Sequence, residues 1–288
     1  MKALDPGQAR TQLATRAVLD ARDERAYAAG HLAGSGNIPR ADFVARRAEL
    51  PPRDAPVLVL AEDAAHAAEA AEALEMLRYR DVAYLDGPLD RIEAGTAARG
   101  PAARLWRPAP LLDEALALLP ELGGLPRRGA APHALDVACG SGRDAVFLAL
   151  HGFQVEARDH DEEALARARE LAARNGVTVR TVRCDLERPG LRRPRRRFDL
   201  VTCFRFLHRP LFPWMEATLA PGGWLVYETF LIGQERFGRP RRAHFLLEPG
   251  ELARAFPGLE TVRYEERDPE GGPVVARLIA RRPTRGRR

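Results

Sequence analysis

The segment from residue 135 to residue 144 combines residue types that bind ligands. It reads Leu-Asp-Val-Ala-Cys-Gly-Ser-Gly-Arg-Asp, so an apolar stretch of strand length leads into two glycines and then into a helical pattern. Gly140 and Gly142 allow the backbone to turn tightly and to approach a ligand without an intervening Cβ atom. The free amides at the start of the following helix can bind an anionic group. This spacing predicts a ligand-binding turn between a strand and a helix.

The glycine turn by itself does not identify its ligand. Residues 140–145, Gly-Ser-Gly-Arg-Asp-Ala, also fit the pattern of dinucleotide-binding folds, with alanine in place of the third glycine. Asp136 argues for a different cofactor, because dinucleotide folds usually have an apolar residue before the turn. A buried carboxylate at this position can instead organise the loop.

Two further carboxylates follow the next two predicted strands. Asp159 is suitably placed to accept hydrogen bonds from ribose hydroxyls, in a dinucleotide as well as in other nucleoside cofactors. Asp185, within Cys184-Asp185-Leu186, can accept an adenine amino group while neighbouring apolar atoms flank the ring. Residues 219–228, Leu-Ala-Pro-Gly-Gly-Trp-Leu-Val-Tyr-Glu, predict a helix end, a turn and another strand. Open α/β sheets bind ligands beyond the carboxyl ends of their strands, so these groups are expected at one site.

In this order, the segments resemble the class I S-adenosylmethionine-dependent methyltransferases over roughly residues 105–280. Within that class, residues 136–144 and 199–210 look most like the tellurite-resistance and related small-molecule methyltransferases. The resemblance implies S-adenosylmethionine as the cofactor and a small molecule as the methyl acceptor. The cofactor contacts that it implies come from the following residues: Asp136, Ala138, Cys139, Gly140, Gly142, Arg143, Asp144, Asp159, His160, Cys184, Asp185, Leu186 and Phe204.

The resemblance also assigns roles within this set. Gly140 and Gly142 line the methionine part of the cofactor, and Asp159 binds its ribose. Asp185 and Leu186 hold the adenine.

Two further assignments leave alternatives open. Arg143 and Asp144 meet the carboxylate and the ammonium of the methionine part, although ordinary helix-start electrostatics explain Asp144 equally well. The three cysteines of the chain are interpreted as small residues packed near the cofactor rather than as redox or metal groups: Cys139, Cys184 and Cys203.

The acceptor is expected at residues 204–209 and 228–230, which follow two neighbouring strands. His208 is the side chain there that titrates near neutrality, so it is the candidate general base; a helix cap or a packing role is the alternative. Arg205 is expected to pair either with an anionic substrate or with Glu228. The predicted catalytic residues are His208, Arg205 and Glu228.

A wider set of residues is expected to contact the acceptor: Trp106, Arg205, His208, Phe230 and Phe237. Trp106 and the loop 233–245 suit a lid, because the loop is long and carries glycines. Methyl transfer from a sulfonium requires a nucleophile held in line and exclusion of water, but no metal. No His or Cys grouping has metal-ligand spacing, so no metal is predicted.

The first part of the chain shows a second resemblance. Residues 19–22, 27–34 and 37–39 resemble the opening of rhodanese domains, and residues 85–90 resemble their closing turn. In that family a cysteine follows the central strand, but here Ala61 follows residues 57–60, and no cysteine precedes Cys139. His66 replaces the arginine expected near the end of the loop. Sulfur transfer needs a thiolate, so the resemblance implies a binding or scaffolding domain that covers the cleft or mediates a homodimer.

The elements that position these residues follow from hydrophobic periodicity. Alternating patterns after residue 110 predict an α/β fold with a seven-stranded, doubly wound, mostly parallel sheet and an antiparallel edge hairpin. The expected strands are 134–138, 153–157, 177–183, 198–203, 223–229, 260–265 and 274–280. The expected helices are 111–119, 144–151, 162–174, 214–219 and 249–256.

The residues before position 95 predict a smaller parallel α/β domain. Its expected strands are 18–19, 57–60 and 82–85, and its expected helix is 64–77. Residues 95–109, rich in glycine, proline and small residues, look like a linker. We therefore expect a rhodanese-like domain over residues 1–100 and a methyltransferase domain over residues 101–288.

The composition excludes several classes of protein. A chain of 288 residues with 45% hydrophobic and 30% charged residues is typical of a globular protein of two domains. No apolar run is long enough to span a bilayer, and the start lacks a signal-peptide layout, so we expect a cytoplasmic protein without membrane contact. Three widely spaced cysteines agree with a reducing compartment.

Two other functions stay open. The arginine clusters 192–197 and 281–288 are interpreted as solvated segments, but they keep an RNA-modifying methyltransferase as an alternative. The glycine turn keeps a nicotinamide-dinucleotide-binding protein as another.

Overall fold

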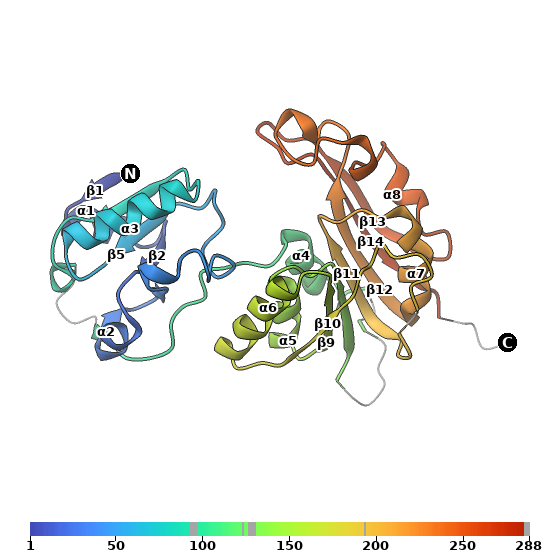
Figure 1. Ribbon diagram of the computed structural model, residues 1–288, viewed down its shortest axis with the longest axis horizontal. Helices are drawn as coiled ribbons and strands as arrows, with labels where there is room; N and C mark the ends of the chain where they lie inside the picture. The colour runs from blue at the N-terminus through green and yellow to red at the C-terminus, as the bar shows by residue number, and fades with distance from the viewer. Residues whose placement is uncertain (93–96, 123, 126–130, 193, 285–288) are drawn as a thin grey trace. The chain divides into compact units, whose positions relative to one another are not determined.

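The computed structural model describes residues 1–92, 97–122, 124–125, 131–192 and 194–284. The chain forms two compact units, Met1–Arg107 and Pro108–Arg288, each built around its own sheet (Figure 1). The predicted linker and both arginine clusters fall partly outside the described residues.

The first unit contains a five-stranded parallel sheet in the order β1-β6-β5-β2-β4. Its strands are β1 (Lys2–Leu4), β2 (Ala17–Asp20), β4 (Gly36–Asn37), β5 (Val57–Leu60) and β6 (Val82–Leu85). All four residues of the central strand β5 are buried, as its uninterrupted Val-Leu-Val-Leu sequence requires for a strand covered on both faces. The small parallel α/β domain expected from the sequence is confirmed.

Three helices accompany this sheet: α1 (Pro6–Gln12), α2 (Glu24–Ala29) and α3 (Ala64–Met76). Helix α3 buries Ala67, Ala71 and Leu74 at three- and four-residue spacing, and it contacts β5 and β6. The short α1 and α2 were not predicted, because neither is long enough to show a helical period. Aspartates at their N-caps nevertheless mark where they begin: Asp5 and Asp23.

The predicted linker is wrong in part, because residues 97–105 lie against the first unit. Strand β7 (Ala97–Ala98) pairs with β3 (His31–Leu32), and the Ala103 amide donates to the Ser35 carbonyl over 2.9 Å. A Cβ atom on Gly36 would lie 2.4 Å from Leu105 Cγ. The missing side chain of Gly36 is therefore what allows the returning chain to pack here.

The second unit contains a seven-stranded sheet in the order β10-β9-β8-β11-β12-β14-β13. Its strands are β8 (His133–Val137), β9 (Gln154–Asp159), β10 (Val179–Arg183), β11 (Phe198–Phe204), β12 (Leu219–Phe230), β13 (Glu260–Arg267) and β14 (Val275–Arg281). The first five strands in this order are parallel, and the last two form an antiparallel hairpin at the edge. The doubly wound sheet expected from the sequence is confirmed.

Helices cover both faces of this sheet (Figure 1). Helices α4 (Pro110–Leu118), α5 (Arg143–Leu150) and α6 (Glu162–Arg174) lie on one face. Helices α7 (Phe212–Thr218) and α8 (Glu251–Arg254) lie on the other, where α7 contributes to the largest apolar cluster. Helix α8 is shorter than predicted. Of the described helices, none is long and apolar enough to cross a membrane.

Candidate functional site

The glycine turn between β8 and α5 is attached to the end of the neighbouring strand. The Gly140 amide donates to Asp159 Oδ2 over 2.9 Å, and the Cys139 amide donates to the Arg158 carbonyl over 3.0 Å. Ala138 and Gly140 both have positive φ values, 56° and 53°. This conformation is rare for a residue with a side chain such as Ala138. The turn is therefore held in one conformation at the carboxyl edge of the sheet.

Asp159 orders this edge through both of its carboxylate oxygens. Its Oδ1 atom accepts from the Asp161 amide over 3.0 Å, while its Oδ2 atom binds Gly140. The side chain is 11% exposed. Since each carboxylate oxygen has two acceptor sites, Asp159 retains capacity for further hydrogen bonds after organising the turn.

A cavity of about 840 Å³ lies at the carboxyl ends of β8, β9, β10 and β11. This volume is within the range of small-molecule and cofactor sites. Its lining includes seven residues predicted to bind a cofactor: Ala138, Asp159, His160, Cys184, Asp185, Leu186 and Phe204. Arg205, predicted to contact the acceptor, lines it as well. Residues far apart in the sequence are thus brought together as the spacing suggested.

Arg183 and Glu187 line the cavity but were not among the predicted site residues. Both flank the segment 184–186, so extending that motif by one residue on each side would have included them. Phe206 also lines the cavity and lies within residues 204–209, where the acceptor was expected. Arg183 Nε also donates to the His160 carbonyl over 3.3 Å, which links the ends of two neighbouring strands.

Asp185 and Leu186 differ in exposure within the cavity. The Asp185 side chain is exposed, and its Oδ1 atom accepts from the Glu187 amide over 3.0 Å. Leu186 is 4% exposed and packs into the apolar core. A polar acceptor at the rim beside an apolar wall is suited to a flat heterocycle that carries an amino group.

Several predicted cofactor residues lie beside the cavity rather than in its lining. Asp136 is 2% exposed and accepts from Thr202 Oγ1 over 2.9 Å, while its Oδ2 atom has no partner within the described residues. Burial raises the pKa of Asp136 well above the usual aspartate value, and the neighbouring Asp144 adds to this shift. These contacts make Asp136 part of the support beneath the turn.

The two glycines of the turn are required for different reasons. A Cβ atom on Gly142 would lie 2.5 Å from the Cβ atom of Ala168 in α6, so this glycine is needed for helix packing. A Cβ atom on Gly140 would meet nothing within 4 Å. Gly140 therefore faces open space, where its backbone can be approached.

Asp144 holds the start of the second unit. Its Oδ1 atom accepts from the Ala109 amide over 2.6 Å, directly before α4. Burial raises the pKa of Asp144 to about 6, against the opposing effects of the Ala109 amide and of Arg143 and Arg205. One carboxylate oxygen that the sequence assigned to a ligand thus binds the backbone of the chain itself.

The segment after β11 is fixed by hydrogen bonds from β12. The Arg205 amide donates to the Glu228 carbonyl, and Tyr227 Oη donates to the Phe206 carbonyl, each over 2.8 Å. Arg205 has a φ of 56°, so it is one of three described non-glycine residues with positive φ, and Ala138 is another. Such backbone conformations cost about 1–3 kcal/mol and cluster at functional sites.

His208 begins the short helix η3 (Arg209–Leu211) and is half-buried. Its carbonyl accepts from the Leu211 amide over 2.9 Å, but its side chain makes no capping hydrogen bond. The alternative interpretation of His208 as a side-chain helix cap is therefore wrong. Its assignment as a general base stays a prediction.

Glu228 forms its ion pair with a residue that the sequence analysis did not consider. Arg277 Nε lies 3.1 Å from Glu228 Oε2, and Arg277 is 2% exposed. The expected alternative, a pair between Arg205 and Glu228, is replaced by this contact, because only β14 runs directly beside β12 on that side. An arginine in the middle of the apolar sequence 275–281 was the available signal.

The remaining predicted acceptor residues are spread more widely. Phe230 ends β12 and is half-buried, whereas Phe237 is 43% exposed with the Arg236 guanidinium 5.2 Å from its ring centroid. The loop 233–245 contains two short helices, η4 (Gln234–Arg236) and η5 (Ala243–Phe245). Trp106 belongs to the first unit and is 3% exposed. The roles of these residues and of the loop as a lid stay predictions.

Within the described residues, no group of three or more His, Cys, Asp or Glu side chains is arranged to hold a metal ion. The three cysteines are free thiols. Burial raises the pKa values of Cys139 and Cys203 above the usual thiol value, which keeps both protonated.

The first unit presents a loop in the place where rhodanese-like domains carry a cysteine. Ala61 follows β5, and Asp63 caps α3 by accepting from the His66 amide over 2.9 Å. The His66 ring also lies 2.9 Å from Asp63 Oδ1. The loop therefore supplies no thiol, and the capping amide binds a carboxylate of the same chain.

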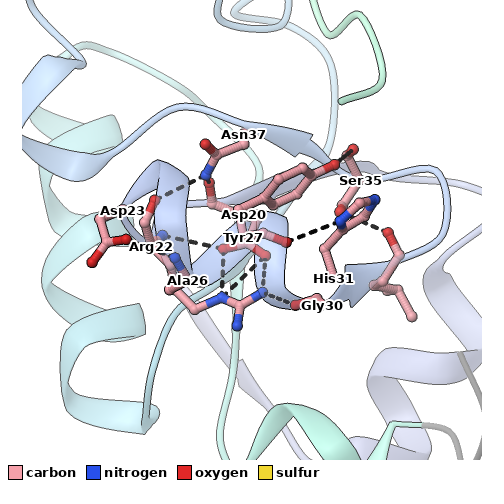
Figure 2. A network of polar contacts seen from close by, with 10 residues as sticks. Asp20, Arg22, Asp23, Ala26, Tyr27, Gly30, His31, Ser35 and Asn37 are labelled. Carbon is pink, nitrogen blue, oxygen red and sulfur yellow. Dashed lines mark hydrogen bonds and ion pairs between the residues drawn. The ribbon is translucent and has the colours of Figure 1, made fainter. Parts of the chain in front are cut away.

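The residues that resemble the opening of rhodanese domains form a polar network (Figure 2). Asp20, which is fully buried, accepts from Arg22, and Arg22 also reaches the Gly30 carbonyl over 2.9 Å. Asn37 donates to the carbonyls of Asp20 and Arg22. This network holds residues 20–37 in place, so these residues are structural.

Two family models match the chain. Residues 5–94 match the model of the rhodanese-like domain, and residues 134–223 match the model of a methyltransferase domain.

Curated relatives match parts of the chain. Hemagglutinin 1 from Eikenella corrodens is 27% identical over 50% of this chain and 52% of its own length. The probable S-adenosyl-L-methionine-dependent methyltransferase TehB from Haemophilus influenzae is 28% identical over 27% of this chain and 28% of its own length. Ribosomal RNA small subunit methyltransferase C from Alcanivorax borkumensis is 37% identical over 27% of this chain and 24% of its own length. The chain thus spans about half of the first relative and about a quarter of the others.

Among solved structures, the crystal structure of TehB from Haemophilus influenzae covers 67% of this chain and 65% of its own, with 19% identity and a TM-score of 0.47. The rhodanese-like match contains strands β2 to β6 of the first unit, and the methyltransferase match contains strands β9 to β11 and most of β8. In this chain a segment that matches the rhodanese-like domain therefore precedes a segment that matches a methyltransferase domain.

Proposed function

We propose that the second unit transfers the methyl group of S-adenosylmethionine to a small-molecule acceptor. The observation that carries this proposal is the cavity at the carboxyl ends of four adjacent parallel strands, with Asp159, Asp185 and Leu186 in its lining. Carboxylates after two successive strands and an apolar wall beside the second match the hydrogen-bonding groups of a ribose and an adenine.

The residues present fit this cofactor. Asp159 would hold the ribose hydroxyls with the acceptor sites that the backbone amides leave open. Asp185 would accept the adenine amino group, while Leu186 and Phe204 flank the ring. Gly140 faces open space, so its backbone would adjoin the methionine part. Once bound, the cofactor supplies an electron-poor methyl group on a sulfonium.

The chain contributes position and exclusion of water rather than covalent chemistry. The hydrogen bonds to Arg205 and Phe206 hold the segment after β11 in one conformation, so that an acceptor beside it would meet a rigid surface. His208 follows on the same segment and would remove a proton from acceptors that need deprotonation. Acceptors that are already anionic would not require this step.

The small-molecule class of the acceptor is supported by the resemblance of residues 136–144 and 199–210 to the tellurite-resistance and related small-molecule methyltransferases. The rhodanese-like domain would act as a binding or scaffolding module. Its strand-end loop has no thiol, and Asp63 already binds an amide there, so a transferred sulfur atom would lack both a nucleophile and a free cradle.

A calorimetric titration tests the cofactor assignment. S-adenosylhomocysteine should bind the full chain, whereas NADH should not. Binding of NADH alone would replace the methyltransferase assignment with a dinucleotide-binding one. The acceptor class is tested by incubating the protein with methyl-labelled S-adenosylmethionine, a metabolite extract and total RNA. Label recovered only in RNA would contradict the small-molecule assignment, whereas loss of RNA retention at moderate salt would weaken the RNA alternative.

A further inference from the structure

Arg277 is the centre of a buried ionic cluster on the sheet face that α4 covers. Its guanidinium reaches three carboxylates from three different elements. Arg277 Nε lies 3.1 Å from Glu228 Oε2, Nη2 lies 2.7 Å from Glu114 Oε1, and Nη1 lies 3.1 Å from Glu265 Oε2. Glu228 belongs to β12, Glu265 to β13 and Glu114 to α4. A single side chain therefore joins the edge hairpin and a covering helix to the strand beside the cavity.

The register of the sheet explains why Arg277 reaches Glu228. The two residues are directly paired across β14 and β12, so their side chains leave the sheet on the same face. Glu228 is in turn paired with Phe204 of β11, which lines the cavity. Glu228 thus stands one strand away from the cavity wall, at the same level along the strands.

The exposure of the cluster shows which contact matters most. Arg277 is 2% exposed and Glu228 is 7% exposed, whereas about a third of the side chains of Glu114 and Glu265 is exposed. Glu114 and Glu265 also contact Arg263, at 3.6 and 3.8 Å. Among the described residues, Glu228 has its ion pair with Arg277 alone. A buried carboxylate that loses such a partner keeps its full desolvation penalty.

Other charged groups also face Glu228 from the neighbouring elements. Arg205 after β11 and Arg267 on β13 favour its ionised form, and Asp144 on α5 interacts with it unfavourably. Burial raises the pKa of Glu228, and the Arg277 guanidinium is the largest opposing influence. The second carboxylate oxygen, Oε1, makes no hydrogen bond within the described part of the chain.

We propose that Arg277 is a positioning residue, which fixes Glu228 Oε2 so that Oε1 is directed at the methyl acceptor beside β11. This assignment rests on the proposed function, because that function places the acceptor beside the segment that follows β11. In this arrangement Arg277 acts on the reaction only through Glu228. The Glu228 carboxylate can then orient or deprotonate the acceptor.

The test follows the Glu228 carboxylate directly by carbon NMR of the full chain labelled with glutamate enriched at Cδ. The Glu228 signal is assigned by its loss in Glu228→Gln. In Arg277→Gln, the titration midpoint of Glu228 should rise by about one pH unit or more, since an adjacent opposite charge shifts a carboxyl pKa by roughly 1–3 units. An unchanged midpoint in Arg277→Gln would overturn the proposal.

Two further variants separate positioning from general stabilisation. Arg263→Gln removes an arginine that contacts Glu114 and Glu265 but not Glu228, so the Glu228 midpoint should stay where it is. Arg277→Lys keeps the positive charge but loses one or more of the three contacts. The titration midpoint of Glu228 should therefore rise much less than in Arg277→Gln. If Arg277→Gln does not fold, a rise of about half a unit in Arg277→Lys supports the proposal, and no rise overturns it.

Binding of S-adenosylhomocysteine distinguishes this inference from the proposed function. Arg277 does not line the cavity, so Arg277→Gln should bind S-adenosylhomocysteine within about twofold of the unaltered chain, below 0.5 kcal/mol. If the unaltered chain itself fails to bind, the proposed function is wrong, while the NMR titration still reports whether Arg277 controls Glu228. A loss of binding in Arg277→Gln alone would mean that Arg277 supports the cavity rather than the acceptor side, and would overturn the positioning role.

Discussion

The two domains each contain a turn in which a buried parallel strand ends and a helix begins, and the two turns differ in which carboxylate binds the backbone amides. After β5, Asp63 caps its own helix by accepting from the His66 amide. After β8, the Gly140 amide is bound by Asp159, which comes from the neighbouring strand β9. A local carboxylate occupies the first turn, whereas a carboxylate from the next strand holds the second turn open beside a cavity of about 840 Å³.

The first domain has a rhodanese-like fold but no thiol after its central strand. The rhodanese-like domain keeps the polar network around Asp20, Arg22 and Asn37 (Figure 2), although Ala61 follows its central strand. In the second domain, Asp159 and Asp185 lie at the ends of two neighbouring strands and line the cavity. Structural polar networks therefore identify the first domain, but only the groups at the strand ends decide what either domain can do.

The largest effect is expected from removing the carboxylate that distinguishes the second turn. Asp159→Ala should weaken S-adenosylhomocysteine binding about 1,000-fold, because two hydrogen bonds to a charged group are lost at roughly 2 kcal/mol each. Isothermal titration calorimetry measures this change. Asp63→Ala is the matched control from the first turn and should leave the affinity unaltered. Equal binding by both variants would refute the proposed site.

A smaller effect is expected from substituting the two glycines of the second turn. One of them is required for helix packing, and the other faces open space. Gly142→Ala should lower the free energy of unfolding by about 3 kcal/mol, since the new Cβ atom meets Ala168 and the residue has a φ of 76°. Gly140→Ala should cost about 1 kcal/mol, because only the backbone conformation is unfavourable there. Urea denaturation provides both values. If the two variants were equally destabilised, the contact with Ala168 would not be what requires Gly142.

A weaker effect is expected from removing the N-cap of α3 in the first turn. Asp63→Ala should destabilise the rhodanese-like domain by about 1 kcal/mol, the usual cost of losing an aspartate N-cap. The change is measured by chemical denaturation, with Asp63→Asn as a control that retains a capping side chain. A stability of Asp63→Asn as low as that of Asp63→Ala would show that capping is not the role of Asp63.

A pH dependence of stability is expected in the second domain. The pKa of Asp144 is raised to about 6 from 3.8, so the folded protein binds more protons than the unfolded chain between these values. The free energy of unfolding should therefore fall as the pH rises from about 4 to about 6. Asp144→Asn should reduce this slope, as measured by urea denaturation at several pH values. A slope identical to that of the unaltered chain would argue against the raised pKa.

Much of the fold could be predicted from the sequence because its signals are local. The central strand β5, strand β6 and helix α6 have the predicted bounds, and helix α3 ends one residue earlier than predicted, since continuous apolar runs and helical periods end at clear breaks. The linker was partly mispredicted because Gly36 and Leu105 lie far apart in the sequence. Pairing of short strands such as β3 with β7 leaves no periodic signal.

The residues of the candidate site were likewise predictable only where their signals are local. The strand-end residues Ala138, Asp159 and Asp185 were identified because each lies at the end of a predicted strand or two residues beyond it. Arg277 was missed because its partner in the sheet follows from strand order rather than from any spacing along the chain. Asp144 was assigned to a ligand because its contact with Ala109 connects residues 35 positions apart.

The sequence by itself determined the two fold classes, the absence of a thiol from the first domain and the carboxylates that end successive strands. These properties depend on residue type and local periodicity, which the sequence states directly. Only the tertiary structure decided that Asp159 holds the glycine turn, that Gly142 serves helix packing and that Arg277 rather than Arg205 pairs with Glu228. Such contacts depend on which strands lie side by side and on burial, which raises the energetic cost of every unpaired charge.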